Sequence, residues 1–261
     1  MLLLLVLIIL FIILLVIMIR YGIFGSFEKY YIPIDIDQIP IYIIHQKNKI
    51  ERYNRLKKEI ETYFSNNPVT FIEPISLKMI HKNLNEYLND KIISQKAYTA
   101  MTKTGKASMG SLTLPALSLY LTNLEIYKKN HKLPFLILED DAIFRENFLL
   151  FFNKILHQLD EDWDILYLSC HFPNEYHQKI YDKDNLVKIK TRIHGMGAVL
   201  YNPAVIHKIL SSIYPIDLQI DHDIPDKLIL TNKINAYIGC NDNNQTIIFN
   251  DNMGGSSTQK N

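Results

Sequence analysis

The sequence predicts an α/β fold, with one main domain built around a mostly parallel central sheet. Short apolar and β-branched runs, such as FLILE at 135–139, alternate with longer segments whose apolar residues recur at helical spacing. With 261 residues, 48% of them hydrophobic, the chain can bury a substantial core. Its net charge of +1 provides no electrostatic footprint for nucleic acid, so no nucleic-acid partner is expected.

The N-terminal segment differs from the rest, because residues 1–19 contain no charged residue and no strong helix breaker. At about 1.5 Å per residue, such a helix is just long enough for a bilayer core. A basic n-region and an A-x-A-like cleavage site are both absent. Residues 1–20 are therefore predicted to be the uncleaved transmembrane anchor of a single-pass membrane protein. Arg20 and Lys29 follow the span and favour a cytoplasmic main domain, but two cations leave its side of the membrane open.

The main domain is expected to begin after a stalk. Residues 21–38 form this predicted stalk, because glycines and a proline interrupt any regular pattern there. The β-branched and aromatic run at 39–45 predicts a buried strand, and apolar residues at helical spacing over 50–64 predict the helix that follows. A second strand is predicted at 69–75, ending near Pro74.

The later elements alternate in the same way. Residues 76–110 are polar and end in TKTGKASMG, which lacks P-loop spacing and is interpreted as a loop. Pro115 begins a predicted helix, and 135–139 is a continuous apolar strand of the kind found inside parallel sheets. Further predictions are a helix at 146–159, a strand at 164–169, an edge hairpin within 172–190, a strand and helix over 197–210 with Asn202 as N-cap, a helix at 223–230, a strand at 234–238, free core cysteines at 170 and 240, and a disordered tail at 251–261.

Three adjacent carboxylates follow the predicted central strand. Glu139, Asp140 and Asp141 repel one another, and an acidic strand end that turns into water is the simplest interpretation. In an α/β sheet, however, ligands bind beyond the carboxyl ends of the strands. Hard carboxylate oxygens at that edge suit Mg²⁺ or Mn²⁺ together with a substrate phosphate. The pattern favours this functional interpretation.

A second acidic group is found in QIDHDIPDK, at 219–227. Asp223 and Asp226 fit a helix N-terminus, where acidic residues are favoured by capping and by the helix dipole. Asp221 is expected to precede the helix, in a loop. If that loop folds over the acid triplet, Asp221 is placed to act as a general base on an attacking hydroxyl. Spacing alone leaves both interpretations of Asp221 open.

Several segments, in order, resemble glycosyltransferase family 25, which includes lipopolysaccharide-biosynthesis and collagen-modifying galactosyltransferases. LILEDDA is similar to the family's L-E-D-D signature, and IPIYIIHQKNKIERYNRL to its opening strand and helix. LTNLEIYKK is similar to its S-H-x-x-x-W-K helix, and HGMGAVLYNPAVIHKIL to its T-H-A-Y-V-I-S segment. IDHDIPDKL with INAYI resembles its closing V-D-x-x-L region. The resemblance covers residues 39–250, which are therefore expected to be a glycosyltransferase domain.

The resemblance implies a GT-A-like nucleotide-sugar-binding domain. Such an enzyme would move a sugar from a nucleotide-sugar donor, first of all a UDP-sugar, to a glycan or glycoprotein acceptor, with Mn²⁺ or Mg²⁺ as cofactor. Asp141 would be the direct metal ligand, and Glu139 and Asp140 would orient donor groups or metal waters. The candidate catalytic residues are thus Asp221, Asp141 and Asp140, the candidate metal ligands Asp141 and Glu139, and the candidate substrate-binding residues His45, Arg52, Asn123, Glu139, His194 and Gln245.

Departures from the family pattern support an alternative, a non-catalytic binding or assembly module. Thr122 and Asn123 replace the Ser-His pair, and 115–119 replaces a G-E-x-G-C turn. The intact triplet and Asp221 favour an enzyme instead. A metal-dependent phosphohydrolase would call for more His or Asp ligands than this strand end offers. The expected partners are a nucleotide-sugar, a glycan or glycoprotein acceptor and, through 1–19, a membrane.

Overall fold

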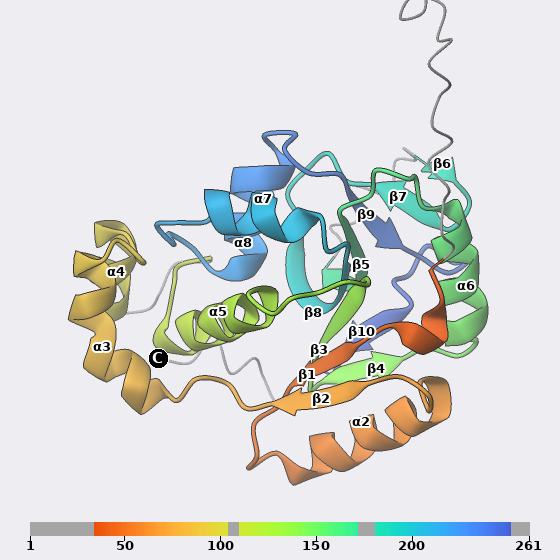
Figure 1. Ribbon diagram of the computed structural model, residues 1–261, viewed down its shortest axis with the longest axis horizontal. Helices are drawn as coiled ribbons and strands as arrows, with labels where there is room; N and C mark the ends of the chain where they lie inside the picture. The colour runs from red at the N-terminus through yellow and green to blue at the C-terminus, as the bar shows by residue number, and fades with distance from the viewer. Residues whose placement is uncertain (1–33, 104–109, 172–180, 252–261) are drawn as a thin grey trace, which may run out of the picture. The chain divides into compact units, whose positions relative to one another are not determined.

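The computed structural model describes residues 34–103, 110–171 and 181–251. Within them, an eight-stranded sheet has the order β2-β1-β3-β8-β5-β9-β7-β6, and helices lie on both of its faces (Figure 1). The α/β class predicted from the alternating pattern is confirmed. The sheet is mixed rather than uniformly parallel, because β8 and the β6–β7 hairpin run against their neighbours.

The first half of the sheet is parallel and aligns three strand ends. β1 (Ile41–Ile44) lies between β2 (Val69–Ile72) and β3 (Phe135–Glu139) and pairs with both in parallel. In the register, Ile44 is opposite Ile72 on one side and Glu139 on the other. The carboxyl ends of β1, β2 and β3 therefore meet at one edge, where the acid triplet begins.

The second half of the sheet contains the antiparallel pairs. β8 (His194–Tyr201) runs antiparallel to both β3 and β5 (Ile165–His171), and β9 (Ala236–Gly239) is parallel to β5. β6 (Tyr181–Lys183) and β7 (Leu186–Lys188) form the edge hairpin expected within 172–190. Because β8 reverses direction, its first residue, His194, lies towards the same edge as the carboxyl end of β3.

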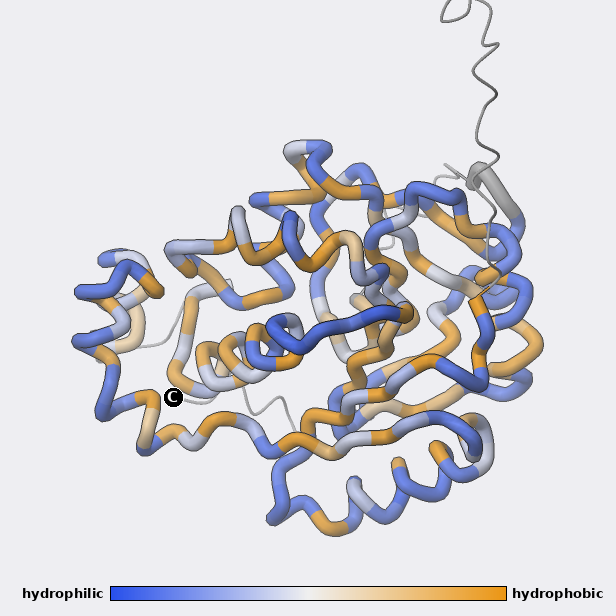
Figure 2. The backbone as a smooth tube through the Cα atoms, viewed as in Figure 1, coloured by the Kyte–Doolittle hydropathy of each residue, from blue (hydrophilic) through white to orange (hydrophobic). Residues whose placement is uncertain are grey.

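Two hydrophobic clusters cover the two faces of the sheet. One packs against α3 (Leu77–Asn89), α4 (Gln95–Thr102), α5 (Leu114–Tyr127) and α7 (Val205–Ser212). The other packs against α2 (Ile50–Tyr63) and α6 (Phe148–Gln158). Alternate residues of β3 contribute to the two clusters. Phe135 and Ile137 belong to the first, and Leu136 and Leu138 belong to the second. In Figure 2, α2 is mainly hydrophilic, and only Leu56 and Ile60 of this helix are buried.

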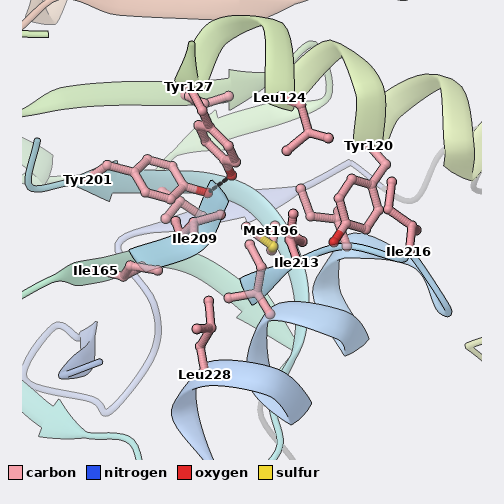
Figure 3. Close-up of a cluster of buried hydrophobic side chains, with 14 of the residues drawn as sticks. Tyr120, Leu124, Tyr127, Ile165, Met196, Tyr201, Ile209, Ile213, Ile216 and Leu228 are labelled. Carbon is pink, nitrogen blue, oxygen red and sulfur yellow. Dashed lines mark hydrogen bonds between the residues drawn. The ribbon is translucent and has the colours of Figure 1, made fainter. Parts of the chain in front are cut away.

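Buried tyrosines fix α5 against the sheet (Figure 3). Tyr127 of α5 and Tyr201 of β8 share a hydrogen bond of 2.7 Å between their hydroxyls. About two turns earlier in α5, the Tyr120 hydroxyl donates to Asp223 at 3.0 Å. The helix begins with an N-cap, because the Thr113 hydroxyl accepts from the amide of Ala116, and Pro115 lies in its first turn. The amino end of α5 is thereby held beside the ends of the parallel strands.

A small two-stranded sheet brings the last described residues to the same edge. β4 (Ala142–Phe144), which follows the acid triplet directly, pairs antiparallel with β10 (Ile248–Asn250). Asp251 was expected to begin a disordered tail, yet its amide donates to the Asp141 carbonyl at 2.8 Å. Residues 252–261 lie outside the described residues. β10 therefore carries Asn250 and Asp251 to the triplet.

Some predicted boundaries shift for local reasons. β2 ends at Ile72, because Pro74 has no N–H and the Ile75 amide donates to Thr122 instead of to a strand. α7 begins at Val205, not at 203, since the Asn202 side chain bonds the Ala204 amide and the Trp163 carbonyl.

The last helix starts earlier than predicted, as α8 (Ile220–Ile224), and continues as the π-helix η3 (Pro225–Ile229). Asp221 consequently lies in the first turn of α8, and the prediction that it precedes the helix is wrong. A short 3₁₀ turn, η1 (Ile36–Gln38), precedes β1.

The prediction of a single-pass membrane protein is contradicted. Among the described residues, no helix has the length and the apolar character that crossing a bilayer requires. The longest of them, α2 and α5, have 14 residues each. At 1.5 Å per residue they extend about 21 Å, short of a hydrocarbon core of roughly 30 Å. The predicted anchor at 1–20 and the predicted stalk up to residue 33 lie outside the described residues.

Candidate active site

A cavity of about 540 Å³ opens at the carboxyl ends of β1, β2 and β3 and extends to the first turns of α5. The acid triplet forms one side of it, together with Arg52 from α2. Residues of the loops after β1 and β2, among them Lys47 and Glu73, line the other side and form an ion pair of 2.5 Å. The cavity thus combines carboxylates, cations and small hydroxyls such as that of Ser118. A polar, charged cavity of this kind suits a small, strongly charged ligand.

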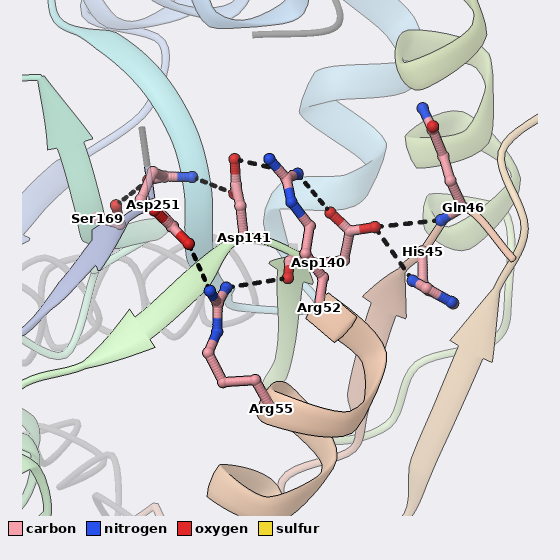
Figure 4. A network of polar contacts seen from close by, with 9 residues as sticks. His45, Gln46, Arg52, Arg55, Asp140, Asp141, Ser169 and Asp251 are labelled. Carbon is pink, nitrogen blue, oxygen red and sulfur yellow. Dashed lines mark hydrogen bonds and ion pairs between the residues drawn. The ribbon is translucent and has the colours of Figure 1, made fainter. Parts of the chain in front are cut away.

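Asp140 is buried and committed to protein partners (Figure 4). One of its oxygens lies 3.1 Å from His45 Nδ1 and accepts from the Gln46 amide at 3.2 Å. The other accepts from Arg52 Nη1 at 3.0 Å. Since a carboxylate has about four acceptor sites, three such bonds leave little capacity for a ligand. Asp140 is therefore the residue of the triplet that fixes its surroundings in place.

Asp141 is held more loosely and faces the cavity. One oxygen accepts from Asn250 Nδ2 at 2.7 Å, and the other lies 3.7 Å from Arg52 Nη1. Burial raises the pKa of Asp141, whereas the Asn250 hydrogen bond and the Arg52 charge act to lower it. An opposing cation in the cavity would favour the charged form of this carboxylate.

Glu139 carries the largest shift in the triplet. Burial raises its pKa first, and the neighbouring charges of Asp141, Asp221 and Asp140 raise it further, to about 8. Arg52 acts in the opposite direction but does not compensate. Glu139 therefore holds a proton near neutral pH unless a cation enters the cavity. The negative charge of Asp221, in the second acidic group, is one of the causes of this raised pKa.

This shift predicts how stability depends on pH without added metal. The pKa of Glu139 in the folded protein is above its ordinary value of 4.5, so between about pH 4.5 and 8 only the unfolded chain loses the proton. Folding stability should therefore fall as the pH rises through this window. Urea unfolding in EDTA measures this effect. Between pH 5 and 8, the free energy of unfolding of Glu139→Gln should rise by at least about 1.4 kcal/mol relative to that of wild type, the equivalent of one pKa unit. Equal slopes for the two proteins would contradict the raised pKa.

A network around Arg55 supports the triplet from behind (Figure 4). Arg55 lies one turn after Arg52 on α2; it donates to Asp251 at 2.5 Å and to the Asp140 carbonyl at 3.5 Å. Ser169 of β5 donates to Asn250 Oδ1 at 2.5 Å, which orients the Asn250 amide towards Asp141. The arginine could have been found from the sequence as the i+3 neighbour of Arg52 on one helix face. No sequence signal marks Asn250 or Ser169, because their partners are remote in the chain.

Gly197 makes room for this arrangement. A Cβ at Gly197 would overlap the Asn250 side chain, which two hydrogen bonds already hold. We expect Gly197→Ala to destabilise the fold by about 1–3 kcal/mol, as overpacking does elsewhere. A double-mutant cycle with Asn250→Ala in urea unfolding tests the cause. Most of the cost of the Gly197 substitution should disappear in the Asn250→Ala background, and fully additive effects would refute this explanation.

The second acidic group divides into three different environments. Asp221 Oδ2 accepts from the Gly195 amide at 2.9 Å, at the start of β8. Asp223 is buried and bonded to Tyr120 and Lys227, the latter at 3.0 Å. Asp226 forms a two-pronged pair with Arg192, with both distances 2.7 Å. Asp223 and Asp226 therefore serve the fold, whereas the charge of Asp221 contributes to the raised pKa of Glu139.

The other residues predicted to bind substrate lie at different distances from the cavity. Arg52 lines the cavity, whereas His45 is buried behind Asp140, beside the rings of Tyr53 and Phe71. His194 lies next to His222, with ring centroids 4.3 Å apart. Like His45 and His194, two more candidates are not among the residues that line the cavity: Asn123 is buried and donates to the Leu119 carbonyl of its own helix, and Gln245 is exposed in a turn with Asn241.

The two residues that depart from the expected Ser-His pair have structural roles. Thr122 Oγ1 donates to the Ser118 carbonyl at 2.7 Å and accepts from the Ile75 amide at 3.1 Å. Thr122 thereby ties α5 to the chain that follows β2. The pair Thr122–Asn123 thus stabilises the wall of the cavity from within.

A charged cavity beyond the carboxyl ends of parallel strands defines an α/β protein that binds its ligand at that edge. Residues 38–223 match the profile of a family described as glycosyltransferase family 25 (LPS biosynthesis protein). Because this match covers most of the chain, the protein belongs to glycosyltransferase family 25 and is a glycosyltransferase. The family resemblance and the enzyme class predicted from the sequence are confirmed.

The crystal structure of mouse xyloside xylosyltransferase 1 in its apo form is similar over 85% of this chain and 87% of that chain, with 10% sequence identity and a TM-score of 0.36. A comparison with curated protein sequences finds no match.

Proposed function

We propose that this glycosyltransferase moves a sugar from a nucleoside diphosphate sugar, first of all a UDP-sugar, to a glycan or glycoprotein acceptor. The observation that carries the proposal is the 540 Å³ cavity at three aligned strand ends, with Glu139, Asp140 and Asp141 along one side. Three adjacent carboxylates are electrostatically costly, and they suit a ligand that arrives with a cation.

The residues fit a divalent cation, Mn²⁺ or Mg²⁺. Asp141 and Glu139 both line the cavity, both present hard oxygen donors, and burial raises the pKa of each. These two would hold the ion, since Asp140 is already bonded to His45, Gln46 and Arg52. When bound, the cation supplies stabilisation of the negative charge that develops on the leaving diphosphate.

The protein's own residues have distinct roles in the proposal. Arg52 lines the cavity as a fixed cation, held by Asp140, and can donate to phosphate oxygens. Asp221 accepts the proton of the attacking acceptor hydroxyl, as the new bond to the anomeric carbon forms and the bond to the diphosphate breaks. Its orientation is set by the Gly195 amide, and its charge already acts on Glu139.

A donor screen tests the proposal. The full chain is incubated with Mn²⁺ and a panel of UDP-, GDP-, CMP- and dTDP-sugars, and release of the free nucleotide is measured with and without EDTA. We expect release from at least one nucleoside diphosphate sugar, and this release should disappear in EDTA. Asp226→Asn is the matched control, because its surface pair with Arg192 lies away from the cavity. Metal-independent release, or release from CMP-sugars alone, would contradict the proposed donor class.

A further inference from the structure

A second group of potential metal ligands lies where β8 and α8 meet. His194, Asp221 and His222 each offer a ligand atom, and these atoms all lie within 4.8 Å of one another. The two imidazole rings are 4.3 Å apart and tilted by 38°. All three residues are partly exposed, so an ion can reach them. Neither histidine lines the cavity beside the acid triplet.

The surrounding chain holds these side chains in position. The Gly195 amide donates to Asp221 Oδ2 at 2.9 Å and so fixes the position of this carboxylate. Gly110, at φ +78°, packs so closely on His222 that a Cβ would lie 2.9 Å from its Cε1 and Nδ1. Gln219 Nε2 donates to the Ser111 carbonyl at 3.0 Å and ties this segment to the start of α8. Ligands restrained in this way lose little freedom when a metal binds.

We propose that His194, Asp221 and His222 form a second cation site that takes a transition metal such as Zn²⁺. Two imidazoles and one carboxylate suit Zn²⁺ or Co²⁺, whereas all-carboxylate donors suit Mg²⁺ and Mn²⁺. Three protein ligands also leave a coordination position open. The site is therefore distinct in metal preference from Asp141 and Glu139.

Occupation of this site has a consequence for transfer, which rests on the proposed function. A metal bound to Asp221 would hold the carboxylate proposed to accept the hydroxyl proton. Zn²⁺ should then inhibit sugar transfer even when Mn²⁺ is saturating. Inhibition should be relieved in His222→Ala, which removes a ligand but leaves Asp221 in place.

Cobalt binding tests the site without reference to activity. The full chain, stripped with chelator, is titrated with Co²⁺, and the visible absorption of nitrogen-ligated cobalt is followed and then displaced by Zn²⁺. We expect binding to weaken by at least about tenfold in His194→Ala and in His222→Ala, since even outer partners of metal ligands cause such losses. Asp141→Asn and the exposed His157→Ala are the controls, and both should bind cobalt as wild type does. Circular dichroism establishes that each variant is folded, and Asp221→Asn replaces any histidine variant that is not.

Two results would overturn the proposal. Equal cobalt binding by wild type and both histidine variants would place the metal elsewhere. Loss of the cobalt signal in Asp141→Asn, with the histidine variants unaffected, would assign the ion to the acid triplet. Neither result bears on sugar transfer itself, so this site and the proposed function fail separately.

Discussion

Asp141→Asn is expected to lower kcat/KM for sugar transfer by about 10²–10³-fold, the loss typical of removing one group that stabilises transition-state charge. The substitution keeps the shape of the side chain and retains an oxygen for the 2.7 Å contact with Asn250. It removes the negative charge that faces the cavity and would hold the cation. Initial rates with the donor found in the screen, over a range of Mn²⁺ concentrations, measure the effect.

Asp226→Asn supplies the matched control for Asp141. It makes the same chemical change in a carboxylate paired with Arg192 at the surface, and its rate should stay within about twofold of wild type, as expected for an exposed pair. A rate for Asp141→Asn within that same twofold range would show that the charge at this position is not needed.

Asp221→Asn is expected to lower kcat by about 10²–10⁴-fold at saturating donor, the usual contribution of a general base. Nucleotide binding should change little, because Asp221 does not line the cavity beside the triplet. The neutral amide still has an oxygen that can accept from the Gly195 amide, so the local fold is kept. The separation between an unchanged dissociation constant for UDP and a lowered kcat distinguishes a base from a donor-binding residue.

Asp223→Asn shows why position within one short helix matters. Asp223 is two residues away, yet its carboxylate is buried against Tyr120 and Lys227. We expect its substitution to reduce stability first, because it removes the buried negative charge that pairs with Lys227 at 3.0 Å. If Asp221→Asn lost only stability, in the same way, the catalytic role proposed for it would be refuted.

Much of the fold could be predicted from local pattern. The strand at 135–139 has the predicted bounds, because a continuous apolar run in the middle of a sheet leaves few alternatives. The edge hairpin and the alternation of strands and helices also agree with the pattern. The direction of the strands was harder to predict from the sequence. The reversal of β8 depends on its pairing with β3 and β5, which no single segment encodes.

The candidate site was predictable only where its residues were close in sequence. The triplet and Arg52 were found, since acidic crowding and a strand-to-helix junction are local signals. Asn250 and Asp251 were not found, because only the β4–β10 pairing brings them to the triplet. Family position alone selected Asn123 and Gln245, and in the fold their side chains bond within their own helix and turn.

The most direct measurement for the whole account is calorimetric binding of UDP to the full chain, with Mn²⁺ and with EDTA, for wild type and Asp141→Asn. Wild type is expected to bind UDP in Mn²⁺, and this binding should be lost both in EDTA and in the Asp141 variant. This result would identify the carboxylates at the end of β3 as the clamp for a nucleoside diphosphate. UDP binding that is unaffected by EDTA and by Asp141→Asn would contradict it, as would the absence of binding of any nucleoside diphosphate to the folded protein.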